Sequence, residues 1–98
     1  MSTKDRESGE GMLVKTTSGS DVDVSSLKPG ARMVFNSNPE DDLPGDQAMY
    51  RVTGPEAGEQ RVIEEVRGRV ILFGRTSDKM GYALDVDKIP KYCRVVDS

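Results

Sequence analysis

The stretch SSLKPGARMVFN, residues 25–36, places a Pro-Gly corner between two segments in which apolar and polar residues alternate. Pro29 fixes its own φ at a value suited to the second position of a β-turn, and Gly30 accepts the positive φ that a type II turn needs at the third. Leu27 continues the apolar face of the preceding segment as far as the turn. Leu27, Pro29 and Gly30 therefore predict a structural corner between two strands.

The segment after the corner, residues 31–36, reads as a strand that leaves the turn at once. In an extended chain, successive side chains point to opposite faces. Met33 or Val34, together with Phe35, is therefore expected to face inward. Before the corner, residues 12–17 and 21–26 predict a hairpin around Ser18-Gly19-Ser20, in which Val22 and Val24 share one sheet face.

The second half of the chain shows the same pattern of short apolar runs broken by Gly and Pro. Residues 55–67 fit either a helix or a strand. We favour the strand because Gly58 would weaken a helix and because Val62, Ile63 and Val66 are β-branched. A tight hairpin at Arg67-Gly68 is expected to lead into residues 69–75, which we expect to be the central strand. The remaining expected elements are strands at 47–53, 81–86 and 92–96, and a corner from Asp87 to Pro90.

Short strands at spacings near ten residues indicate an all-β fold, which we expect to be a small antiparallel OB-like β-barrel. Residues 1–11 mix charges with Ser and Gly and have no apolar side chain between Met1 and Met12, so they predict a disordered tail. Residues 12–98 then form one domain.

The size and charge of the chain limit the classes of function open to it. With 98 residues and 35% hydrophobic composition, the core is thin, and neither a deep pocket nor a small-molecule substrate is expected. The net charge of −3 argues against a general polyanion binder. Residues 1–50 carry five basic and nine acidic side chains, and residues 51–98 carry nine and eight, so the acidic excess falls in the first half.

The chain has no histidine and a single cysteine, Cys93. It therefore lacks the commonest general base and the commonest metal ligand, and it has no thiolate cluster. We expect no enzymatic activity, no cofactor, no metal site and no disulfide within the chain. The sequence contains no pattern typical of a signal peptide or of a membrane span, so we expect a cytoplasmic protein with no membrane partner.

Residues 37–46 hold two prolines, a glycine and several carboxylates, and predict a surface loop rather than a regular element. Calcium accepts several oxygen ligands from one flexible loop, but the spacing here differs from the helix-flanked pattern and Pro44 restricts the chain. A solvated acidic loop is favoured. Its carboxylates are Glu40, Asp41, Asp42 and Asp46.

Four arginines surround the hairpin expected near residue 68, namely Arg61, Arg67, Arg69 and Arg75. Together with Tyr50 and Tyr82 they are the candidate interaction surface. A basic face with exposed aromatic rings is typical of single-strand nucleic-acid binding. The aromatic residues are poorly interleaved with the arginines, however, and neighbouring glutamates can neutralise these charges as cross-strand pairs.

Two longer stretches carry a resemblance to a known family. VKTTSG, followed by VDVSSLKPGARMVFN, resembles the OB-type domain that precedes the ATPase module in proteasomal AAA ATPases. The matching positions are Ser18, Gly19, Val22, Val24, Leu27, Pro29, Gly30, Val34 and Asn36. The stretch EEVRGRVILFGR, followed by MGYALDVDKIPK, is similar to the barrels of the actinobacterial ring-forming members. The matching positions here are Gly81, Tyr82, Ala83, Ile89, Pro90 and Lys91.

The chain departs from that family in three ways: it has no preceding coiled coil, it has no ATPase module, and it carries the acidic Pro-rich insertion at 39–46. The resemblance implies a non-catalytic module for oligomerisation and protein contact, whose partner is a protein or a second copy of itself. The alternative hypothesis is a small β-barrel that binds single-stranded nucleic acid.

Overall fold

The computed structural model describes residues 12–45, 54–76 and 80–97. The predicted disordered tail at 1–11 and the predicted strand at 47–53, which contains Tyr50, lie outside the described residues, as does Asp46.

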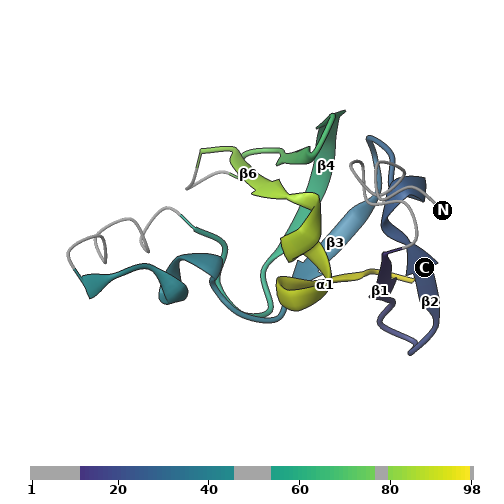
Figure 1. The fold of residues 1–98 in the computed structure, drawn as a ribbon, viewed down its shortest axis with the longest axis horizontal. Coiled ribbons are helices and arrows are strands. Elements are labelled where there is room, and N and C mark those ends of the chain that lie inside the picture. The colour runs from purple at the N-terminus through teal and green to yellow at the C-terminus, as the bar shows by residue number, and fades with distance from the viewer. Residues whose placement is uncertain (1–11, 46–53, 77–79, 98) are drawn as a thin grey trace, which may run out of the picture.

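The regular structure of the described chain consists mainly of antiparallel strands (Figure 1). The strands are β1 Leu13–Lys15, β2 Asp21–Asp23, β3 Arg32–Phe35, β4 Gln60–Arg67, β5 Val70–Phe73, β6 Tyr82–Asp85 and β7 Cys93–Val95. The helical segments are the 3-10 turns η2 Val24–Ser26, η3 Pro39–Asp42 and η5 Val86–Lys88, and the short α1 Ile89–Tyr92.

These strands form two sheets. β1 and β2 make a hairpin, and the other five strands pair in the order β6-β5-β4-β3-β7. An isolated parallel bridge between Thr16 and Val95 connects the hairpin to the larger sheet. The prediction of a mostly β, antiparallel fold is confirmed. The pairings among the described residues do not define a closed barrel.

The corner at Pro29-Gly30 forms as predicted. Gly30 has a φ of 97°, and the amide of Ala31 donates to the carbonyl of Lys28 at 3.0 Å, as a type II turn requires. The amide of Gly30 also donates to the carbonyl of Ile63 at 2.8 Å. The corner is therefore tied to β4 as well as closing on itself.

The strand after the corner turns alternate residues into the core. Met33 and Phe35 are buried, whereas Arg32 is exposed and Val34 is half-buried. The ring of Phe35 meets that of Phe73 edge to face at 5.1 Å between centroids. The core is completed by apolar side chains from every part of the described fold, namely Val14, Val24, Leu27, Ile63, Ile71, Leu84, Val86, Ile89, Tyr92 and Cys93.

The segment with two possible interpretations is a strand. β4 begins at Gln60, and Gly58 just before it has a φ of 85°, a left-handed conformation that no α-helix contains. The hairpin after it closes one residue later than predicted, because Arg67 pairs with Val70 and leaves Gly68 and Arg69 in the turn.

Two details of the predicted strands are wrong. Val24 lies in the turn η2 instead of continuing the strand of Val22, because Asp23 caps that turn by accepting from the amide of Ser25; both valine side chains still pack in the core. The strand in 69–75 is β5, which lies one place from the edge, and only Ile71 and Phe73 are buried on it. β4 is the middle strand because it pairs with both β3 and β5.

The expected corner at 87–90 and the start of the last strand also differ. Residues 86–92 wind through η5 into α1, so Tyr92 belongs to α1 and β7 begins only at Cys93. Pro90 fits there because the first helical turn needs no amide donor from it. This winding carries Ile89 and Tyr92 into the core.

Candidate protein-interaction site

The acidic segment 37–46 is not a plain loop, which corrects the prediction. Residues Pro39–Asp42 form the 3-10 turn η3, whose first amides are capped by the side chain of Asn38, which accepts from the amide of Glu40 at 2.9 Å. Asn38 and Pro39 are both buried. We call residues 38–43 the strap.

The base of the strap is held by close packing against the segment that leads into β4. The side-chain Nδ2 of Asn38 donates to the carboxylate of Glu56 at 3.1 Å. A Cβ atom built on Gly54 would come within 2.3 Å of the Asn38 side-chain oxygen, so only glycine allows this approach. The strap is therefore anchored at its N-terminal end.

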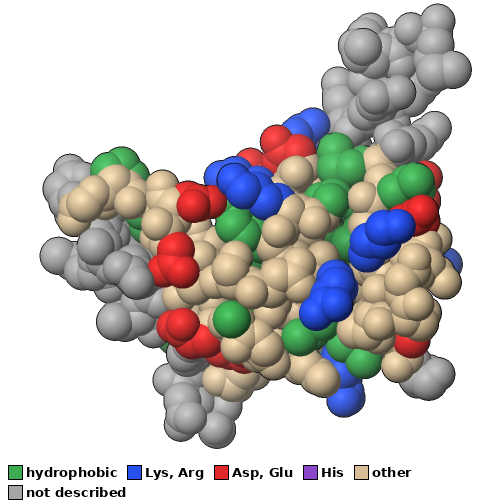
Figure 2. Space-filling model, turned by 90° about the horizontal axis from the view of Figure 1, so that it is seen from below, with side chains coloured by type: hydrophobic (Ala, Val, Ile, Leu, Met, Phe, Trp, Pro, Cys, Tyr) green, Lys and Arg blue, Asp and Glu red, His purple; other side chains and the backbone are tan. Residues whose placement is uncertain are grey.

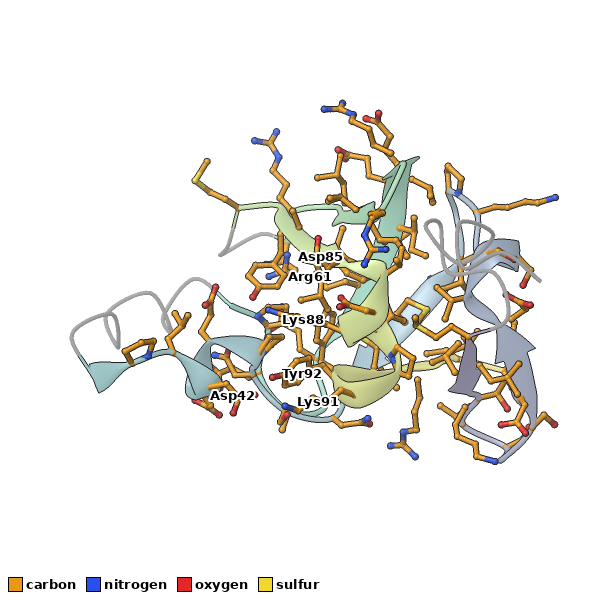
Figure 3. The ribbon with its side chains drawn as sticks, viewed as in Figure 1. Asp42, Arg61, Asp85, Lys88, Lys91 and Tyr92 are labelled. Atoms are coloured by element: carbon orange, nitrogen blue, oxygen red, sulfur yellow. The ribbon has the colours of Figure 1, made fainter. Side chains whose placement is uncertain are left out.

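The far part of the strap docks on two tyrosines. Tyr82 of β6 donates its hydroxyl hydrogen to Glu40 at 3.0 Å. Tyr92 of α1 donates to Asp42, and the ammonium of Lys91 lies 3.3 Å from the same carboxylate. Figure 3 shows Asp42, Lys91 and Tyr92 close together where η3 meets α1. We call Tyr82, Lys91 and Tyr92 the tyrosine cluster.

The environment of Tyr82 keeps its hydroxyl protonated. Burial raises the pKa of Tyr82 above its ordinary value, and the hydrogen bond to Glu40 and the negative charge of that carboxylate raise it further. The ammonium of Lys91 lies 5.2 Å from the centre of the Tyr92 ring, within the range of a cation–π contact. The cluster thus presents two hydroxyl donors and one cation to two carboxylates.

The four arginines predicted to form one surface do not come together. Arg61 is buried, with its Nε 2.6 Å from Glu59 and its Nη1 donating to the carbonyls of Gly74 and Met80, each at 3.1 Å. Its Nη2 is buried and makes no hydrogen bond to any residue that the structure describes. Arg61 is a structural residue of the interior and is not available to an external partner.

The other three arginines are exposed but lie at opposite ends of the β4–β5 hairpin. Arg67 precedes the turn and binds Glu65 at 2.9 Å, and Arg69 lies within the turn, 3.9 Å from Asp87. Arg75 follows the far end of β5, near the position where Ile63 pairs with Phe73. No shared basic face results, and Tyr82 faces the strap instead of joining the arginines.

A basic surface that the sequence analysis did not identify lies on the outside of the larger sheet. The pairings Val34 with Arg94 and Arg32 with Val62 place these four side chains on the face opposite Met33 and Phe35. Arg32, Val62 and Arg94 are exposed. We call these four residues the outer sheet face. The sequence could have predicted two of these four residues, because Arg32 and Val34 alternate with the core residues Met33 and Phe35 in residues 31–36.

Within the described ranges, no group of three or more His, Cys, Asp or Glu side chains is placed to hold a metal ion. No helix among the same residues has the length and hydropathy needed to cross a membrane. Comparison with protein-family models, with curated proteins and with solved structures finds no match to the chain.

Proposed function

We propose that the chain is a non-catalytic module that works by protein–protein contact on an OB-like barrel framework, and that its first partner is a second copy of itself. The observation that carries this proposal is the separation of opposite charges on one molecule. Glu40, Asp41 and Asp42 stand on the strap, while Arg32 and Arg94 stand on the outer sheet face.

The two charged regions lie on different parts of the surface. Figure 2 shows several acidic side chains along the left of the view, and basic side chains both at the upper left and to the right of the centre. A contact between the strap of one copy and the outer sheet face of the next is heterologous, and repetition of such a contact produces rings or filaments. The resemblance to ring-forming ATPase barrels favours the ring.

The outer sheet face also offers apolar area to a partner. Val62 is 41% exposed between charged and polar neighbours, and Val34 beside it on β3 is half-buried. The guanidinium of Arg94 is held by a hydrogen bond from its Nε to Asn36 at 2.8 Å. Positioned arginines around a small apolar centre are typical of protein interfaces.

The use of titratable groups within the chain favours a role without catalysis. Glu40 and Asp42 bind the tyrosine cluster, Glu59 binds Arg61, and Glu65 binds Arg67. A general acid or base must instead be aimed at a substrate. These carboxylates serve contacts between segments of the fold.

Sedimentation velocity over a series of concentrations tests the proposal. We expect association at low salt that weakens as salt is added, because exposed charges are screened beyond the Debye length. Arg32→Glu/Arg94→Glu should sediment as a monomer, and the control Arg67→Glu/Arg69→Glu, with the same charge change at the hairpin tip, should associate as the wild type does. A wild-type chain that stays monomeric at high concentration and low salt refutes self-association.

A further inference from the structure

We propose that the tyrosine cluster is a receptor for acidic peptide segments of partner proteins, and that the carboxylates of the strap occupy it as an intramolecular competitor. The ligand is a segment that presents two carboxylates two residues apart, as Glu40 and Asp42 do. The receptor here is the tyrosine cluster, whereas the receptor in self-association is the outer sheet face, so the two proposals share the strap carboxylates but can be tested separately.

The recognition chemistry can be read from the contacts that the strap itself makes. One carboxylate accepts from the Tyr82 hydroxyl, and the other accepts from the Tyr92 hydroxyl and meets the Lys91 ammonium. Hydrogen bonds to ionised acceptors are stronger than neutral ones. A neutral peptide of the same shape would lose both the charge assistance and the ion pair.

The strap is held firmly at one end and weakly at the other. Asn38 and Pro39 are buried, and Asn38 fits against Gly54 with no room for a Cβ. In contrast, the side chains of Lys91 and Asp42 are 68% and 56% exposed, and ion pairs this exposed contribute little to stability. The Asp42 carboxylate can therefore leave the cluster while the anchor stays in place, and the Glu40 carboxylate can leave by rotation of its own side chain.

The cluster retains its donors when the carboxylates leave. Tyr92 is buried by its packing in the core, and its backbone carbonyl accepts from the amide of Asn36 at 2.6 Å, a contact that involves no strap carboxylate. Tyr82 packs edge to face on Phe35 at 6.4 Å between centroids. Both hydroxyls are thus positioned by the body of the fold, which makes a preformed site for a second acidic segment.

The test compares peptide binding to the full chain and to Glu40→Gln/Asp42→Asn, called the neutral-strap variant because amides replace the two carboxylates that bind the cluster while Asp41 is kept. The probes are a fluorescent peptide of residues 37–45, SNPEDDLPG, and the counterpart SNPQDNLPG, called the neutral peptide because amides replace both carboxylates that bind the cluster and only the Asp41 carboxylate remains; binding is followed by fluorescence polarisation. A tethered competitor acts at high effective concentration. We expect the variant to bind the acidic peptide about tenfold more tightly than the wild type, which corresponds to about 1.4 kcal/mol.

Two controls separate the site from general electrostatics. Asp21→Asn/Glu65→Gln removes the same charge elsewhere and should bind as the wild type does. In the neutral-strap background, Lys91→Glu should abolish binding. Lys15→Glu should leave it unchanged, because Lys15 is a lysine of similar exposure, 61%, in an ion pair with Asp21. Circular dichroism confirms that each variant is folded.

The inference is overturned if the wild type and the neutral-strap variant bind the acidic peptide equally, if the neutral peptide binds as well as the acidic one, or if the neutral-strap variant binds neither. Any of these results leaves self-association through the outer sheet face untouched. Conversely, if the wild type stays monomeric and the peptides bind as expected, only the self-association is rejected.

Discussion

Replacing Arg61 by methionine should destabilise the protein far more than the same replacement of Arg67. The two arginines are matched, because each forms an ion pair with the glutamate two residues before it, at 2.6 Å for Arg61 and 2.9 Å for Arg67. They differ in burial: the Arg61 side chain is 1% exposed and the Arg67 side chain is 72% exposed.

The magnitude follows from what Arg61→Met leaves behind. The carbonyls of Gly74 and Met80 lose a donor, and the carboxylate of Glu59 loses its cation. Removing one partner of a buried pair costs about 3–5 kcal/mol. Glu59 is 19% exposed and regains some hydration, and the Nη2 without a hydrogen bond is removed as well. Both effects reduce the loss, so we expect about 2–3 kcal/mol.

Urea denaturation followed by circular dichroism measures this difference, and thermal melting gives a second readout. For a domain of this size, a loss of about 2–3 kcal/mol lowers Tm by roughly 10–20 °C. Arg61→Lys should lie between Arg61→Met and the wild type, because it keeps the charge but not the planar fork. Arg67→Met should melt as the wild type does. Equal losses in Arg61→Met and Arg67→Met would refute the structural role of Arg61.

Two further predictions concern the corner and the lone thiol. Gly30→Val should lower the free energy of unfolding by more than about 1 kcal/mol, because a β-branched residue resists the positive φ there. The control is Gly45→Val, at a glycine with no positive φ and open space around it. Equal urea midpoints for the two variants would contradict the turn assignment. Burial raises the pKa of the Cys93 thiol above its ordinary value, so the native protein should resist thiol reagents that label it quickly in urea. Because the pKa of the Cys93 thiol is raised in the folded state, the stability that the buried, protonated thiol contributes is complete below the unfolded thiol's ordinary pKa of about 8.5. It declines as the pH rises above that value. Urea titrations between pH 7 and pH 10 should show a steeper alkaline loss of stability in the wild type than in Cys93→Ala, and parallel curves would contradict the burial of a protonated thiol.

The corner and the strands were readable from the sequence because they rest on neighbouring residues. Pro29 and Gly30 impose their turn through their own φ preferences, and the alternation around Met33 and Phe35 selects the inward face whatever strand pairs with it. The same local evidence favoured a strand over a helix for β4, and Gly58, two residues before it, adopts a φ that a helix excludes.

The site required the tertiary structure. Glu40 contacts Tyr82, which is 42 residues later in the sequence, and Asp42 contacts Tyr92, which is 50 residues later. No local sequence pattern predicts either contact. Arg61 resembled its exposed neighbours in sequence, yet its position on the inward face of β4 makes it an interior residue. Turn and strand preferences act within a few residues, whereas the burial and partner of a side chain are decided by which distant segments the chain packs against it.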